Sequence, residues 1–230
     1  MAKLRLAGIL ICLGAVSIGA VTLRASGSDD SAVISFKGPV NWALATKPCA
    51  AIRAVDPNPG KLATIFSNFG RPGHLYEGDI SWDVAGPHSG VQEQWVAMPF
   101  TPKFDAVVTQ ISVAVAHNTG SPNSFVLSVN EDNGGQVPGD PIRSWLVKNA
   151  PKYGTCCALD VVNDSKGIKV KKGTQYWVVA KTNASEQETR MEWDLSPRGG
   201  ESNFAFNNGQ GWYGYTAFTS AFAIYGNKIK

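Results

Sequence analysis

The chain has 230 residues, of which 43% are hydrophobic, and carries 21 basic and 18 acidic residues for a formal net charge of +3. A chain of this length can form one all-β domain with a substantial core. Lys3, Arg5 and Arg24 belong to the N-terminal segment, and without them 18 basic residues face 18 acidic ones. The remaining chain therefore lacks the positive excess that nucleic-acid binding requires, and we expect no nucleic-acid partner.

Residues 1–25 are predicted to be an export signal. Lys3 and Arg5 precede an uncharged apolar run from Leu6 to Leu23. Basic residues followed by an apolar run are typical of a signal peptide. The run is close to the ~20 residues that a membrane-spanning helix needs, so an uncleaved anchor is the alternative. Cleavage would leave a secreted or periplasmic protein with no membrane segment.

Residues 26–61 are predicted to form an extended arm or linker. The stretch is rich in Ser, Asp and Ala, and Pro39, Pro48, Pro57 and Pro59 interrupt any regular element.

Residues 62–226 are predicted to form a single β domain, because apolar and polar residues alternate between turns rich in Gly, Pro and Asn. Residues 70–90 are expected to be a long loop. Two segments show this alternation most clearly. Ile111, Val113 and Val115 share one face of the first segment, and Phe125, Leu127 and Val129 share one face of the second. The expected strands are Leu62 to Phe69, Glu93 to Phe100, Ile111 to His117, Phe125 to Glu131, Ile142 to Val147, Cys156 to Val162, Thr174 to Lys181, Arg190 to Leu195, Ser202 to Phe206 and Phe218 to Gly226.

This series of short strands, with no helical repeat between them, predicts an all-β fold: an antiparallel β-sandwich, jelly-roll-like, behind the signal peptide. An immunoglobulin-like sandwich is the second choice. The number of strands is high for it, and no Cys, Trp, Cys spacing spans the sheets.

Three cysteines remain after the export signal: Cys49, Cys156 and Cys157. On a strand the two neighbours would point to opposite faces, so one could pair with Cys49 while the other packs as a small apolar residue. A bond between the two neighbours is the strained alternative. The three are disulfide candidates, and they lack the nearby histidine that a metal site would favour.

Four strings of the sequence occur in an order and spacing that resemble a family of secreted bacterial domains. They are Gln94 to Ala97, Asp132 to Gly139, Tyr153 to Cys157 and Lys172 to Trp177. The family is the choice-of-anchor type, in its R-like form. The resemblance implies a β-sandwich without a defined biochemical role, carried to the cell surface by a sorting segment. After Tyr225 no Pro-Glu-Pro signature or apolar span follows, so release is expected rather than surface anchoring.

Glu192 and Asp194 form the most enzyme-like pattern, since two carboxylates two residues apart on a strand share one face. Paired carboxylates are the catalytic groups of glycosidases. Jelly-roll glycanases with a similar strand carry a third acid at the position that Pro197 occupies here. We therefore expect exposed strand carboxylates and keep a glycan-active hydrolase as the alternative.

Asp132 and Asn133 are a weak calcium candidate, because oxygen-rich turns suit that ion. The turn lacks the alternating acids of a calcium loop and has the Asn and Gly residues that tight turns prefer. No metal and no cofactor is expected.

A group of aromatic residues offers the positive hypothesis. Trp212, Tyr213 and Tyr215 lie between glycines in a turn or hairpin expected to be exposed, and Trp82 lies in the expected long loop. Flat aromatic faces stack on sugar rings while neighbouring polar groups bind hydroxyls. The sequence thus predicts an exported, non-enzymatic domain for binding or surface interaction, with a glycan or another envelope protein as partner. A structural envelope component is the remaining alternative.

Overall fold

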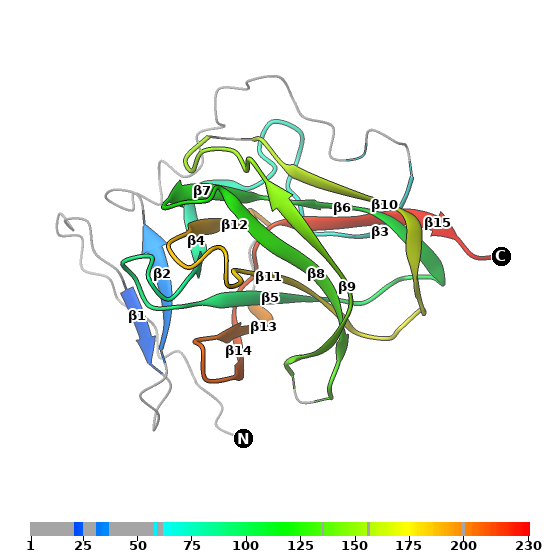
Figure 1. The fold of residues 1–230 in the computed structure, drawn as a ribbon. Helices are drawn as coiled ribbons and strands as arrows, with labels where there is room; N and C mark the ends of the chain where they lie inside the picture. Colours follow the sequence, from blue (N-terminus) through cyan, green and yellow to red (C-terminus); the bar gives the residue numbers. More distant parts are fainter. Residues whose placement is uncertain are drawn as a thin grey trace.

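The computed structural model describes residues 21–24, 31–36, 58, 62–134, 136–155, 157–198 and 201–230 (Figure 1). Of the expected export signal, only β1 (Val21–Arg24) is described. Of the expected arm, the described residues are Asn58 and β2 (Ser31–Phe36), which pairs with β1 on one side and with β4 (Glu77–Ala85) on the other.

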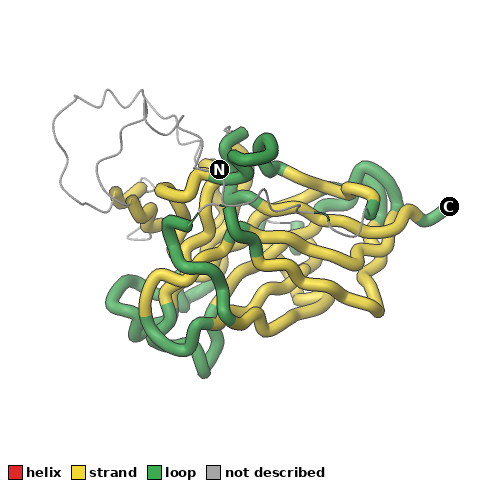
Figure 2. Tube along the Cα trace, turned by 90° about the horizontal axis from the view of Figure 1, so that it is seen from above, coloured by secondary structure: helices red, strands yellow, loops and turns green. Residues whose placement is uncertain are grey.

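The described residues form strands and loops throughout, as Figure 2 shows from above. No helix in this part of the chain is long and apolar enough to cross a membrane. The further strands are β3 (Ala63–Ser67), β5 (Trp95–Phe100), β6 (Ala106–Val113), β7 (Val115–Thr119), β8 (Ser124–Asp132), β9 (Pro138–Lys148), β10 (Asp160–Val170), β11 (Tyr176–Lys181), β12 (Arg190–Leu195), β13 (Glu201–Asn207), β14 (Trp212–Phe218) and β15 (Phe222–Lys228).

These strands make three antiparallel sheets that form two layers. A six-stranded sheet has the order β14-β13-β5-β11-β8-β9 and is one layer. The other layer combines the sheet β1-β2-β4-β12-β7 with the sheet β10-β6-β15-β3. The two are continuous at Ala114, whose N–H donates to Ala221 and whose carbonyl accepts from Asp194. This arrangement confirms the predicted all-β antiparallel sandwich.

The core lies between the layers and follows the predicted alternation. Phe125, Leu127 and Val129 of β8 are fully buried in it. Ile111 and Val113 of β6 and Val115 of β7 join them, although the chain changes sheets at Ala114. Burial of each large aliphatic side chain stabilises the fold by about 1.5–3 kcal/mol. The period of two therefore located the inward faces correctly.

The expected loop of residues 70–90 is wrong, because it contains the nine-residue strand β4. Ile80, Trp82 and Val84 are buried in the core, and β4 pairs along its length with β12. Alternation of apolar and polar residues from Ile80 to Val84 was the available signal. The glycines and prolines on either side of this short run, which mark loops, obscured it.

The residues Trp212 to Tyr215, which were expected to form an exposed turn or hairpin, lie in a hairpin: they begin its second strand, β14, which is the edge strand of the six-stranded sheet. The turn comes earlier, at residues 208–211, where Gly209 has a φ of 89° that favours glycine. β14 pairs with β13 from Trp212↔Asn207 to Phe218↔Glu201.

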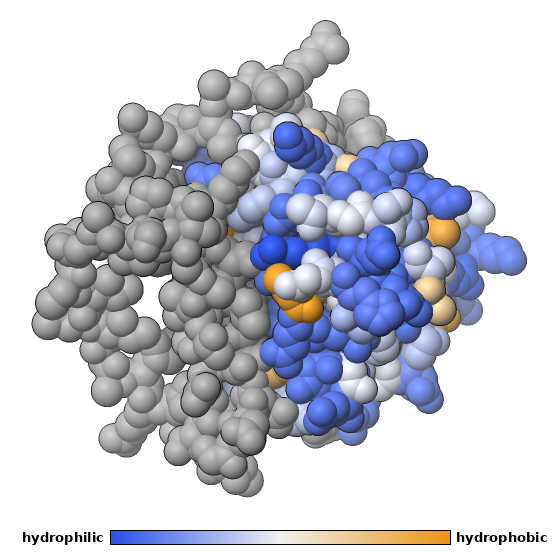
Figure 3. Space-filling view, turned by 60° about the vertical axis from the view of Figure 1, so that its left-hand side comes forward, coloured by the Kyte–Doolittle hydropathy of each residue, from blue (hydrophilic) through white to orange (hydrophobic). Residues whose placement is uncertain are grey.

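The surface of the described residues is mainly hydrophilic on the side seen in Figure 3, with only small hydrophobic spots. Exposed large apolar side chains in the described part of the molecule are Ile142, Leu146, Phe218 and Ile229. Scattered residues of this kind are ordinary on a globular surface.

Candidate functional site

Trp82 does not have the exposed position that a ligand-stacking residue needs. Its side chain has an exposed fraction of 0% and stacks on Phe204 with ring centroids 4.5 Å apart. The indole N–H donates to the carbonyl of Phe218 at 2.9 Å. Because the indole ring stacks on Phe204 and the indole N–H is hydrogen-bonded inside the fold, Trp82 is a core residue.

The other three aromatic residues predicted to bind a ligand, Trp212, Tyr213 and Tyr215, lie on opposite faces of β14. Successive side chains on a strand point to opposite faces. Tyr213 and Tyr215 turn inward and stack on Phe206, with centroids 5.6 and 5.2 Å from it. Trp212 turns to the outer face of the six-stranded sheet and remains partly exposed. Of the four predicted residues, Trp212 alone presents its side chain on that outer face.

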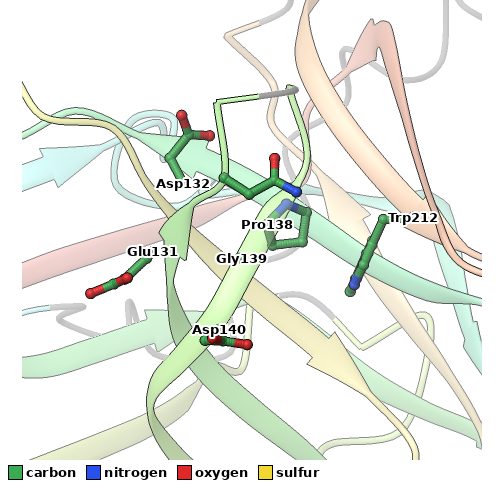
Figure 4. Close-up of a pocket in the computed structure, with 7 residues that line it drawn as sticks. Glu131, Asp132, Pro138, Gly139, Asp140 and Trp212 are labelled. Carbon is green, nitrogen blue, oxygen red and sulfur yellow. The ribbon is translucent and has the colours of Figure 1, made fainter.

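A pocket of about 460 Å³ lies between Trp212 and the β8–β9 hairpin (Figure 4). Its lining is polar, and three of the seven lining residues are acidic. The residues are Glu131, Asp132, Asn133, Pro138, Gly139, Asp140 and Trp212. The fold thus brings Trp212 to the same pocket as Asp132 and Asn133, which the sequence singled out for separate reasons.

Asp132 anchors the hairpin to the sheet. One carboxylate oxygen accepts the indole N–H of Trp177 at 2.7 Å and the amide of Gln175 at 2.9 Å, and the other accepts the N–H of Gly134 at 3.2 Å. These three hydrogen bonds hold the carboxylate in place and link the hairpin to the residues around β11. Among the described residues, no group of three or more His, Cys, Asp or Glu side chains is placed to hold a metal ion.

The hairpin also rests on β14 beside Trp212. A Cβ atom at Gly214 would lie 2.7 Å from the carbonyl oxygen of Gln136, so only glycine allows this approach. Gln136 itself has a φ of 63°, an uncommon value for a residue with a side chain. The tip of the hairpin is therefore held close to the strand that carries Trp212.

Trp95 extends the aromatic surface beyond the pocket. It lies on β5, its ring centroid is 6.4 Å from that of Trp212, and Lys181 stands over it at 5.3 Å. Trp95 is not among the aromatic residues that the sequence pattern singled out. Trp95 lies two residues before Ala97 on β5, and residues two apart on a strand point to the same face. Because Ala97 packs on the outer face beside Trp212, the side chain of Trp95 lies on that face too.

Glu192 and Asp194 do share one face of β12, but the expectation that they are exposed is wrong. Their exposed fractions are 0% and 1%. Glu192 pairs directly across from Asp83 of β4, and like charges in that position destabilise a sheet. Arg190 offsets this repulsion, with its Nε 2.7 Å from Asp83 and 3.2 Å from Glu192.

Both oxygens of Glu192 accept further hydrogen bonds. Ser81 donates at 2.7 Å to one, and the amide of Asn118 donates at 2.6 Å to the other. Burial, and then the nearby Asp83 carboxylate, raise the pKa of Glu192 to about 8, although Arg190 and the two donors act in the opposite direction. These contacts tie β4, β12 and β7 together, and they leave Glu192 no exposed surface from which to act on a substrate.

Of the three disulfide candidates, Cys157 is disulfide-bonded. Cys49 and Cys156 lie outside the described residues. The bonded Cys157 packs beside a small second cluster of buried residues that includes Phe69 and Tyr76.

Comparison of the chain with protein-family models, with curated proteins and with solved structures found no match. The resemblance to choice-of-anchor domains therefore stays a prediction from the sequence.

Proposed function

We propose that this chain is an exported, non-enzymatic β-sandwich domain that binds carbohydrate at the Trp212 pocket. The observation that carries the proposal is the partly exposed indole of Trp212 at a pocket lined by carboxylate and amide groups. An indole face stacks on the apolar face of a sugar ring, and carboxylates and amides bind its hydroxyl groups.

The rigidity of the pocket supports the proposal. Trp177 and Gln175 fix Asp132, and the hairpin tip rests on Gly214. Trp212 itself begins a strand that is paired with β13 over seven residues. A site held in place before the ligand arrives loses less conformational entropy on binding.

Two features support export. The apolar run from Leu6 to Leu23 follows two basic residues in the manner of a signal peptide. Cys157 is disulfide-bonded, and structural disulfides form mainly in oxidising compartments outside the cytosol.

A glycan array followed by calorimetry on the responding oligosaccharide tests the proposal. Trp212→Ala should weaken binding at least tenfold, because the stacking face is lost. Phe218→Ala is the matched control: Phe218 is an exposed aromatic on the same face of β14 but does not line the pocket. An array without any response, or equal binding by the wild type and Trp212→Ala, would contradict carbohydrate binding here and leave the structural envelope role.

A further inference from the structure

All the charged residues that line the Trp212 pocket are acidic. Three of its lining residues are carboxylates, Glu131, Asp132 and Asp140, and Asn133 adds a neutral amide. No lysine, arginine or histidine occurs among the described residues that line it. Glu131 and Asp140 are exposed, so neither charge is enclosed within the fold.

Two basic residues of the same sheet are engaged elsewhere. Arg143 of β9 forms an ion pair with Asp164 of β10, on the other layer of the sandwich. Lys181 of β11 stands over the ring of Trp95. Arg143 and Lys181 thus have partners outside the pocket, and Lys148 lies at the opposite end of β9 from the pocket residues Pro138, Gly139 and Asp140. The carboxylates of the pocket therefore keep a negative potential at its opening.

From this arrangement we infer that the ligand of the Trp212 pocket is a cationic sugar, one whose ring carries a free amino group. The inference rests on the proposed function and names its ligand class. The ring stacks on Trp212, and its ammonium group pairs with Asp140. A uronic or sulfated sugar would meet like charge, whereas a neutral sugar would gain hydrogen bonds from its hydroxyl groups to the carboxylates but no charge pairing.

Figure 4 shows how the two groups share the pocket. Trp212 stands on one side of the hairpin, Asp140 lies on β9 further along it, and Glu131 points away from Trp212. Asp140 is therefore the residue expected to contact the ammonium group, and Glu131 contributes through the field at longer range. Asp132 is committed to Trp177 and Gln175 and positions the hairpin.

A matched pair of ligands tests the inference. Oligomers of glucosamine and of N-acetylglucosamine of equal length differ in the charge of the amino group, which acetylation removes. Calorimetry at low salt and at a pH where the amine is protonated should show the glucosamine oligomer binding about tenfold more tightly. Added salt should reduce that ratio, because it screens exposed charges.

Two variants separate the inference from the proposal on which it rests. Asp140→Asn should lower the ratio of the two affinities by about threefold or more and leave the acetylated oligomer bound as before. Trp212→Ala should weaken both. If the acetylated oligomer binds as tightly as the charged one, or if Asp140→Asn leaves the ratio unchanged, the cationic ligand is overturned while carbohydrate binding stands. If neither oligomer binds while another glycan on the array does, the cationic ligand is overturned and carbohydrate binding stands; if no glycan binds, both are overturned.

Discussion

At the scale of single residues, Arg190 decides whether the opposed acidic side chains of Asp83 and Glu192 can be buried. Asp83 and Glu192 face each other on neighbouring strands, and both contact the guanidinium. Removing one partner of a buried ion pair leaves an uncompensated charge, which costs far more than losing an exposed pair.

Arg190→Met should therefore destabilise the fold by about 3 kcal/mol. Urea unfolding of the variant and of the wild type measures the difference in free energy of unfolding. Arg198→Met is the control, because Arg198 is exposed, and its replacement should change stability by less than about 0.5 kcal/mol. Equal effects of the two substitutions would argue against a buried network.

The same network predicts how stability depends on pH. The pKa of Glu192 is about 8 in the fold, against an ordinary value of 4.5, so the fold favours the protonated carboxyl. The contribution of Glu192 to stability is complete below pH 4.5 and is lost as the pH rises toward 8. Burial also raises the pKa of Asp160 to about 7, which acts in the same direction.

Urea unfolding between pH 4 and pH 9 should thus give a free energy of unfolding that falls as the pH rises. Glu192→Gln, which cannot ionise, should make that decline shallower. A free energy that rises over this range, or a slope that Glu192→Gln does not alter, would show that Glu192 titrates in the fold as it does in the unfolded chain.

At the scale of elements, period-two alternation explains both the successes and the errors of the sequence predictions. It identified β8 and β12 because their alternation runs between clear turns. It was missed in β4, whose alternation from Ile80 to Val84 is short and surrounded by Gly and Pro. In β14 the aromatic cluster suggested one surface, whereas strand geometry sends Trp212 to one face and Tyr213 and Tyr215 to the other.

Contact between two elements, the β8–β9 hairpin and β14, gives a prediction about the pocket. Gly214→Val places a side chain against the carbonyl of Gln136, and the hairpin must move. We expect destabilisation of about 1–3 kcal/mol and weaker binding of the responding oligosaccharide.

Thr216→Val is the control for this change. Thr216 is the next outward position on β14, is exposed and does not line the pocket. Calorimetry and urea unfolding of both variants make the comparison. Wild-type affinity in a folded Gly214→Val protein would mean that the hairpin does not shape the binding site.

At the scale of the whole molecule, the two layers carry different features on their outer faces. The six-stranded sheet bears the Trp212 pocket, and the five-stranded sheet bears the buried network around Glu192. The sequence could predict neither assembly. Trp212 and Asp140 line the same pocket although β14 and β9 lie at opposite edges of one sheet, because the β8–β9 hairpin reaches across to β14. This relation depends on strand order rather than on local sequence pattern.

The two-layer core also predicts that two tryptophans named together from the sequence will behave differently. Trp82→Ala should destabilise the fold by about 3–5 kcal/mol, because it empties a fully buried site. Trp212→Ala should change the free energy of unfolding by less than about 1 kcal/mol and act mainly on binding. Similar losses of stability in the two variants would contradict the placement of Trp212 on the outer face.

The central claim is that Trp212 is the surface on which a sugar stacks. The most direct measurement follows the indole N–H signals of the seven tryptophans by NMR while the oligosaccharide that ranks first on the array is added. The signal of Trp212 should shift most and that of neighbouring Trp95 less, while the signals of the buried Trp82 and Trp193, which do not line the pocket, stay unchanged. Shifts that leave Trp212 unaffected would contradict the claim.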